Sequence, residues 1–140
     1  MVEENIFSLI LDKKVPCYKI YEDGLVLAFL DINPFSSGHT LLIPKERVAT
    51  LDKLSAESAS AIGKVLPKIS KAILEVVNTK EFNIIQNNGS NAFQTIPHVH
   101  FHIIPKFEDG LGYQFPSKNY PIDHNEAIIL ANKISSILSD

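Results

Sequence analysis

Apolar residues along the chain follow two spacings, one typical of strands and the other of helices. Three runs rich in branched and aromatic residues predict strands within 17–24, 25–34 and 38–45, the last stopped by Pro44. Two further runs, 81–86 and 98–104, predict two more strands, the second closed by Pro105. Glu22-Asp23-Gly24 and Asn87-Asn88-Gly89 supply turn residues between these runs.

Helical spacing occurs in three places. A short helix is predicted within 5–14, where Ile6, Leu9 and Ile10 share one face. A long helix begins after the N-cap candidate Ser55, and Pro67 is expected to bend or break it. Its predicted apolar face holds Ile62, Leu66, Ile69, Ile73 and Val76. The last helix starts near Asp123, and its apolar face holds Ala127, Leu130, Ile134 and Leu138.

The order of these elements indicates the fold class. The connections between most strands are short enough for antiparallel pairing, and the helices do not alternate regularly with the strands. We therefore predict an α+β fold, with a mainly antiparallel five-stranded sheet, a short N-terminal helix, a long central helix and a C-terminal helix.

Length and composition exclude several classes of protein. The 140 residues fit one domain, and the net charge of −3 argues against a partner that is a nucleic-acid polymer or an anionic membrane. The single cysteine, Cys17, excludes an intramolecular disulfide and a Cys-rich zinc site, and we expect it to be a buried packing residue. The acidic start and short apolar run of the N-terminus do not resemble a signal peptide. No apolar run approaches the ~18 residues of a membrane span, so a cytoplasmic location is expected.

The segment 96–106, IPHVHFHIIPK, holds three of the chain's five histidines at alternate positions. Because side chains of a strand alternate between faces, His98, His100 and His102 are predicted to share one face. Val99, Phe101 and Ile103 then share the opposite face and are expected to pack on the core.

Two kinds of chemistry compete for this row of imidazoles. One is a metal site formed by His98 and His100 with His39, although a strand spreads three collinear histidines too far for one ion. The other is nucleophilic catalysis by the central histidine, in which one ring nitrogen is held and the other faces an electrophile. The preceding loop offers backbone N–H groups around Gly89, the amide of Gln94 and the hydroxyl of Thr95, and such donors suit phosphate.

The motif HVHFHII resembles the signature of the histidine triad (HIT) superfamily of nucleotide hydrolases and transferases. The resemblance extends over most of residues 5–107, and the C-terminal helix resembles the Hint-like and microbial branch. It implies a single HIT domain over 1–140, with a core of 5–107, an extension of 108–140, and a homodimer.

The resemblance also implies a reaction. His100 would attack the α-phosphate of a purine nucleotide conjugate such as a nucleoside 5′-phosphoramidate and form a nucleotidyl-histidine intermediate. His98 and His102 would flank the nucleophile, and His39 would support them by hydrogen bonding, without a metal or a cofactor. The alternatives are hydrolysis of dinucleoside polyphosphates and a purine-nucleotide-binding scaffold with little catalysis.

Positions of the nucleotide pocket carry over from the same resemblance. Asp31 falls where a carboxylate holds the ribose hydroxyls, which is a sound physical match because it accepts two hydrogen bonds. Asn87, Gln94 and Thr95 fall where polar groups contact the phosphate or the leaving group. The apolar side chains expected around the purine are Ile6, Phe7, Ile10, Phe29 and Ile32.

The sequence departs from the family pattern at two places. Many microbial members carry Cys-x-x-Cys near the start as part of a zinc site, whereas this chain has Asn5 and Ser8, so we predict no such site. The family usually has glycine before the glutamine, whereas this chain has Phe93, which affects the leaving-group side of the pocket. His124 lies outside the motif and is given no role.

Overall fold

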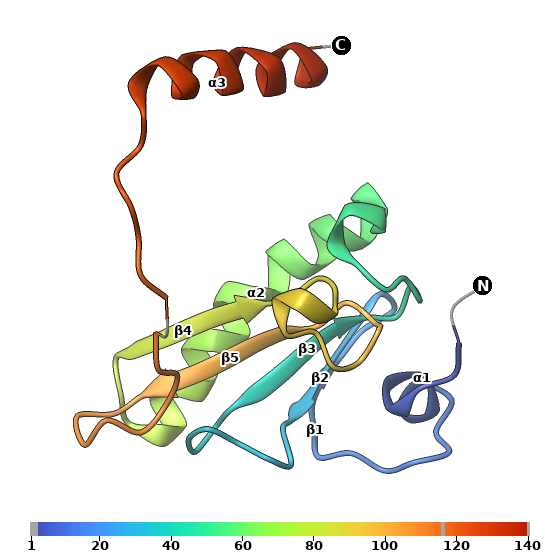
Figure 1. The fold of residues 1–140 in the computed structure, drawn as a ribbon. Helices are drawn as coiled ribbons and strands as arrows, with labels where there is room; N and C mark the ends of the chain where they lie inside the picture. Colours follow the sequence, from blue (N-terminus) through green and yellow to red (C-terminus); the bar gives the residue numbers. More distant parts are fainter. Residues whose placement is uncertain (1–2, 116, 140) are drawn as a thin grey trace.

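Five strands form one antiparallel sheet in the order β1-β2-β3-β5-β4 (Figure 1). The computed structural model describes residues 3–115 and 117–139, so both ends of the predicted 1–140 domain lie outside the described residues. The predicted α+β class with an antiparallel five-stranded sheet is confirmed. The strands are β1 (Lys19–Glu22), β2 (Val26–Leu30), β3 (Thr40–Pro44), β4 (Glu81–Gln86) and β5 (Phe101–Lys106).

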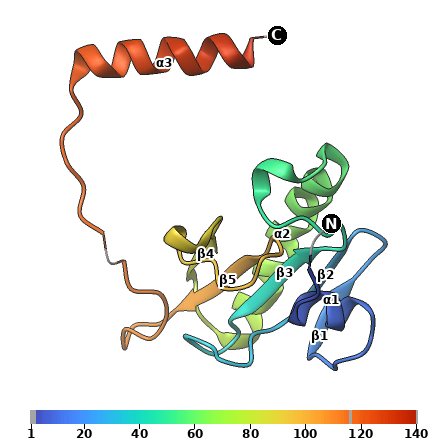
Figure 2. The ribbon, with the colours of Figure 1, turned by 45° about the vertical axis from the view of Figure 1, so that its right-hand side comes forward.

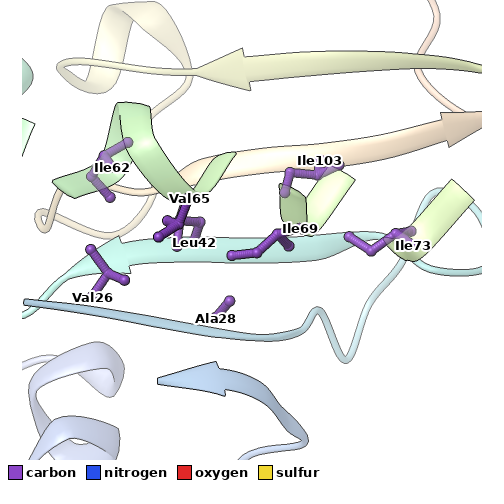
Figure 3. Close-up of a cluster of buried hydrophobic side chains, with 8 residues drawn as sticks. All are labelled: Val26, Ala28, Leu42, Ile62, Val65, Ile69, Ile73 and Ile103. Carbon is purple, nitrogen blue, oxygen red and sulfur yellow. The ribbon is translucent and has the colours of Figure 1, made fainter. Parts of the chain in front are cut away.

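The long helix α2 (Ala56–Val77) covers one face of the sheet. The predicted N-cap is confirmed, since the Ser55 side chain accepts a hydrogen bond from the Ser58 N–H. The buried cluster between this helix and the sheet is drawn in Figure 3 and comprises Val26, Ala28, Leu42, Ile62, Val65, Ile69, Ile73 and Ile103. Burying this apolar surface contributes on the order of 25 cal/mol per Å², so the cluster stabilises the sheet against α2.

The short helix α1 (Ile6–Leu11) lies against the opposite face of the sheet. Leu27 and Phe29 of β2 point to this face, while Val26 and Ala28 point to α2, as strand alternation requires. The cluster on the α1 side consists of Phe7, Ile10, Leu27, Phe29, Leu41 and Ile43. The sheet is therefore buried on both faces along β2, which explains the unbroken apolar run in that strand.

Several predicted boundaries and helix positions were wrong. The last strand begins at Phe101 instead of 98, and Pro105 lies inside it, whereas β3 ends at Pro44 as predicted. On α2, Val65 is buried and the predicted Val76 is 83% exposed. Pro67 does not break the helix, because the side of α2 that carries it is exposed and water can satisfy the carbonyl that loses its N–H partner.

The C-terminal helix α3 (His124–Leu138) stands away from the rest of the molecule (Figures 1 and 2). Its predicted start is confirmed, since the side chain of Asp123 accepts hydrogen bonds from the N–H groups of Asn125 and Glu126. Within the described residues, no helix combines the length and apolar character that crossing a membrane requires. The expected cytoplasmic location stays a prediction.

Candidate functional site

A cavity of about 420 Å³ opens on the α1 face of the sheet, beside the histidine segment. Its walls come from α1, the end of β2, the β2–β3 connection and the segment before β5. Most residues predicted for the site line this one cavity: Ile6, Phe7, Ile10, Phe29, Asp31, Ile32, His39, Thr95, His100 and His102. Segments far apart in the sequence therefore meet at one place.

The ring of His100 is held through its backbone-facing nitrogen. Its Nδ1 lies 2.7 Å from the carbonyl oxygen of His98, and because a carbonyl can only accept, Nδ1 carries the proton. In a neutral ring this leaves the lone pair on Nε2. The ring of Phe7 packs edge-on against it, with centroids 4.9 Å apart, which restricts its rotation. His100 is thus a buried imidazole whose free nitrogen has no proton.

A second chain of hydrogen bonds fixes His39 and His102. The backbone N–H of Phe35 donates to Nδ1 of His39 over 3.0 Å, so Nε2 of the neutral ring carries the proton. That Nε2 lies 2.9 Å from Nδ1 of His102, which must therefore accept. The proton of His102 is then on Nε2, so this ring offers an N–H donor beside His100, with ring centroids 5.0 Å apart.

His98 lies outside the cavity and is fully buried. Its Nε2–H donates to the carbonyl of Pro44 over 2.9 Å, which ties the histidine segment to the end of β3. Its Nδ1 is buried without a partner among the described residues. The contact of His98 with the cavity is therefore indirect, through the backbone carbonyl that holds His100.

Asp31 borders the cavity at the end of β2. Its Oδ1 accepts the backbone N–H of Asn33 over 2.8 Å, so the residue stabilises a turn as well as presenting a carboxylate. Its Oδ2 lies 3.4 Å from Nε2 of His39, and the side chain is 17% exposed. One carboxylate oxygen thus faces both the cavity and the histidine chain.

The four histidines of the site are held neutral near pH 7. Burial lowers the pKa of His39, His98 and His100 below the usual histidine value, because a charged ring loses its hydration there. Burial, followed by repulsion from neighbouring rings, lowers the pKa of His102 to about 4. The lowered pKa values favour the neutral tautomers assigned above.

Two predicted pocket residues, Asn87 and Gln94, lie outside the cavity. Gln94 braces the loop, since its Nε2 donates to the carbonyls of Ala49 and Ile96 and its Oε1 accepts the Gly89 N–H. In this conformation both of its amide protons are engaged. Only Thr95 of the three polar residues predicted to contact the phosphate or leaving group borders the cavity.

Phe93 occupies a left-handed backbone conformation, with φ 69° and ψ 19°. Aromatic residues adopt this conformation rarely, and it costs of order 1 kcal/mol. Its side chain is 79% exposed, so no burial compensates for the strain. The sequence departure noted above therefore falls at a position where the backbone favours glycine.

The cavity includes residues that the sequence did not suggest. The important one is Phe35, because its backbone N–H sets the tautomer of His39 and its ring packs on that histidine, with centroids 5.3 Å apart. Cys17, expected as packing, is half-buried and borders the cavity. The remaining additions are Val15, Pro16, Leu30, Asn33, Leu41 and Ile96. Leu30, Asn33 and Ile96 are direct sequence neighbours of residues already predicted, whereas Val15 and Pro16 have no such signal.

Asp31, His39 and His102 form a cluster whose ligand-type atoms lie within 4.8 Å of one another. This differs from the trio of His98, His100 and His39 that the sequence offered as a metal site. A metal on Nε2 of His39 would need that nitrogen without its proton, whereas the bond from the Phe35 N–H places the proton there. The hydrogen-bond pattern therefore favours a hydrogen-bonded chain over ligation of a metal ion.

Asn5 and Ser8, the two positions compared above with Cys-x-x-Cys, cap helix α1. The Asn5 Oδ1 accepts the N–H groups of Phe7 and Ser8, and the Ser8 Oγ accepts the Asn5 N–H in return. This reciprocal capping box satisfies the free donors of a short helix. Both side chains thus have a structural role that needs no metal.

The site combines a buried imidazole lone pair with a neighbouring N–H donor. A lone pair on His100 Nε2 can attack an electrophile, and the carbonyl behind Nδ1–H stabilises the positive charge that the ring then acquires. The N–H of His102 can donate to an oxygen of the electrophile. The apolar wall around Phe7 and Phe29 suits a planar, weakly polar group such as a nucleobase.

Comparisons with known proteins agree with this geometry. The sequence profile described as HIT domain matches residues 12–109. The chain is 47% identical over 133 residues to the adenosine 5′-monophosphoramidase hnt1 of Schizosaccharomyces pombe, covering 94% of this chain and 96% of that relative. A solved member of the HIT family from Bacillus subtilis has a TM-score of 0.92 at 34% identity and covers 99% of both chains. The histidine triad nucleotide-binding protein of Candida albicans has a TM-score of 0.86 at 34% identity and covers 96% of both chains.

Proposed function

The chain belongs to the HIT domain family, and on this premise we propose that it is a nucleotide hydrolase that cleaves a purine nucleoside 5′-phosphoramidate or related conjugate at the α-phosphate. The observation that carries the proposal is the hydrogen bond from His100 Nδ1 to the His98 carbonyl, which leaves Nε2 as a lone-pair nucleophile at the cavity. The similarity to an adenosine 5′-monophosphoramidase supports the choice of a P–N linked substrate.

The reaction proceeds in two steps. Nε2 of His100 forms a bond to phosphorus as the bond to the leaving amine breaks, and the amine takes up a proton from solvent water. A water oxygen then bonds to phosphorus, the bond to His100 breaks, and a water proton is released with the mononucleotide. The His102 Nε2–H donates to a phosphoryl oxygen in both steps, so its contribution is positioning and charge stabilisation.

The nucleotide lies with its base between apolar side chains and its ribose at Asp31. Two ribose hydroxyls donate to the Asp31 carboxylate, whose Oδ2 already faces His39. Thr95 contacts the phosphate or leaving group. The side chains that enclose the purine are Ile6, Phe7, Ile10, Phe29 and Ile32.

Turnover of an adenosine 5′-phosphoramidate tests the assignment. His100→Ala should lower kcat/KM by several orders of magnitude, because no other group takes over the covalent step. His124→Ala is the matched control, since this exposed histidine lies on α3 and outside the cavity, and its turnover should stay unchanged. Retained turnover in His100→Ala would show that His100 is not the nucleophile.

The same preparation distinguishes the alternatives. Faster cleavage of a dinucleoside polyphosphate than of the phosphoramidate would reassign the substrate class. Tight AMP binding without a burst of product at stoichiometric enzyme would favour a binding scaffold. The proposal includes no metal, so turnover should survive removal of metal ions by a chelator; loss that zinc restores would favour the Asp31, His39 and His102 cluster as a metal site.

The proposed enzyme is a homodimer. Strand β4 is at the edge of the sheet, and its Phe82 and Ile84 are 39% and 38% exposed. A groove of about 770 Å³ runs between β4 and α2 beside them, and its apolar lining includes Leu66, Pro67 and Leu74. An unpaired strand edge with apolar side chains favours pairing with a second copy. Light scattering on the purified chain measures the state directly.

A further inference from the structure

A chain of hydrogen bonds runs from the β2–β3 connection to the cavity, and it can have either of two directions. The N–H of Phe35 faces Nδ1 of His39 over 3.0 Å, and Nε2 of His39 lies 2.9 Å from Nδ1 of His102. Each neutral ring carries a single proton, so a proton on Nε2 of His39 requires one on Nε2 of His102 as well. Only this direction leaves His102 with an N–H that can donate to a substrate.

The reversed direction would place two donors against each other. With the proton on Nδ1 of His39, that N–H would face the N–H of Phe35, and neither could accept. His39 is 2% exposed, so water cannot replace the missing acceptor, and the reversed state is disfavoured by at least about tenfold. In that state His102 would donate to His39 and turn a lone pair toward the cavity, where it would repel a phosphoryl oxygen.

A second group favours the same direction, but the substrate competes for it. Oδ2 of Asp31 lies 3.4 Å from Nε2 of His39, and a carboxylate can only accept. In the proposed complex the ribose hydroxyls donate to the same carboxylate. The N–H of Phe35 acts on the other ring nitrogen of His39, so bound substrate does not compete for it.

The β2–β3 connection holds this donor in place. The N–H of His39 donates to the carbonyl of Ser36 over 3.1 Å, and Gly38 has φ +88°, as the third residue of a type II turn requires. Ser36 Oγ donates to the carbonyl of Pro105 over 2.6 Å, which ties the turn to β5. The ring of Phe35 packs on His39, with centroids 5.3 Å apart. The fold therefore keeps the Phe35 N–H aimed at the histidine ring.

We propose that Phe35 is a positioning residue of the reaction, whose backbone N–H sets the direction of the chain through His39 and so keeps an N–H of His102 available for the phosphoryl oxygen. The last step of this inference rests on the proposed function. The proton positions themselves are a property of the free protein and are measured without substrate.

Heteronuclear NMR of the histidine rings in the full chain measures these proton positions. His39 and His102 should both carry the proton on Nε2, with Nδ1 unprotonated. A scalar coupling across the hydrogen bond should join the amide nitrogen of Phe35 to Nδ1 of His39. A proton on Nδ1 of either ring in the unmodified chain overturns the proposal.

A single-atom change tests whether Phe35 sets the direction. Phenyllactic acid in place of Phe35 turns the backbone amide into an ester, so an acceptor oxygen replaces the N–H while the aromatic ring is kept. The protons of His39 and His102 should then move to Nδ1. The kcat for an adenosine 5′-phosphoramidate should fall at least about tenfold with KM changed less than about threefold, because the base and ribose contacts remain.

Two variants separate this donor from the rest of the connection. Phe35→Ala removes the ring but keeps the N–H, so it should leave the proton positions unchanged. Ser37→Pro removes a different N–H at an exposed position, the second residue of the turn, where proline is favoured. It should leave the proton positions unchanged and kcat within about threefold of the unmodified chain.

Unchanged proton positions in the ester variant, or altered positions in Phe35→Ala or Ser37→Pro, would overturn the role of the Phe35 N–H. An unchanged kcat after the ring protons reverse would equally overturn it, since the His102 N–H would then contribute nothing to the reaction. Absence of phosphoramidate turnover in the unmodified chain would count against the proposed function, and the ring spectra would still decide the direction of the chain.

Discussion

The hydrogen bonds of three buried histidines and the half-buried His102 assign one proton to each ring. The carbonyls of Pro44 and His98 can only accept, and the N–H of Phe35 can only donate, so three backbone groups determine the tautomers. The roles then differ in a way that the motif alone does not reveal. His100 presents a lone pair, His102 presents an N–H, and His98 holds the segment in place.

The sequence could predict part of this arrangement. Alternation along 98–102 is enough to put the three imidazoles on one side, and the observed ring contacts place all three on the α1 side. The link between His39 and His102 spans 63 residues and depends on the pairing of β3 with β5. The bond from Phe35 depends on a turn conformation that has no residue-type signature, so spacing could not reveal it.

Phe93→Gly should stabilise the protein by about 1 kcal/mol, because glycine adopts the left-handed conformation without strain. The substitution relieves the strained φ of 69°. It loses little packing, because the ring of Phe93 is exposed. Denaturant unfolding of both proteins measures the difference. Phe115→Gly is the control, because it removes an exposed ring outside the cavity and should leave the free energy of unfolding unchanged. Phe35→Gly would not serve as a control, because Phe35 packs on His39. Equal or lower stability of Phe93→Gly would show that the ring makes contacts that compensate for the strain.

At the scale of elements, the β2–β3 connection positions His39. Ser36 Oγ donates to the carbonyl of Pro105 over 2.6 Å, and the Asp31 N–H donates to the His39 carbonyl over 2.9 Å. Gly38 has φ +88°, and a Cβ there would lie 2.9 Å from Val77 Cγ1 and 3.0 Å from Ile73 Cγ2. Close packing on α2 therefore determines where the connection, and with it His39, can lie.

Gly38→Ala should destabilise the fold by about 1–3 kcal/mol and lower phosphoramidate turnover, because both the clash and the positive φ displace His39. Gly24→Ala is the control, since a Cβ at Gly24 meets no atom within 4 Å, and its effect should stay within about 0.5 kcal/mol. Thermal unfolding and steady-state kinetics measure both effects. Unchanged turnover in a correctly folded Gly38→Ala protein would show that the position of His39 does not depend on the packing of the connection against α2.

The sequence predicted helix α2 and the antiparallel sheet correctly, because each depends on one clear signal. The apolar spacing and Ser55 were enough to locate α2, and the antiparallel sheet followed from short connections. The start of β5 was predicted too early because the alternation of His98 and Val99 continues beyond the ladder that pairs from Phe101. Alternation describes which side a residue faces and does not require a strand partner.

At the scale of the whole molecule, the buried histidines link stability to pH. The folded protein keeps His102 neutral down to about 4, whereas the unfolded chain takes up a proton near the ordinary histidine pKa of 6.5. Between these values the unfolded state binds more protons, so stability is complete above 6.5 and falls as the pH is lowered towards 4. The lowered pKa values of His39, His98 and His100 add in the same direction.

The free energy of unfolding, measured by chemical denaturation, should therefore fall by about 1–3 kcal/mol between pH 7.5 and pH 4.5, after allowance for partial solvent screening of His102. His102→Gln should flatten the curve, while His124→Gln, outside the site, should not. A constant free energy of unfolding over this range would contradict the neutral histidine chain.

The position of α3 relative to the sheet is the whole-molecule feature that the sequence could not predict. The apolar spacing and Asp123 were enough to locate α3 along the chain, yet where it leaves the sheet depends on Gly112 and Lys106 at the end of β5. A hydrophobic pattern shows that a helix face needs covering and does not identify what covers it.

The central claim is that Nε2 of His100 forms a covalent bond to the α-phosphorus. The most direct measurement is rapid quenching of stoichiometric enzyme with an adenosine 5′-phosphoramidate, followed by proteolysis and mass spectrometry to locate a nucleotidyl group. The account predicts an adenylyl group on His100 that forms and decays at rates compatible with turnover, and its absence in His100→Ala. An adduct on another residue, or full turnover without any adduct on His100, would contradict it.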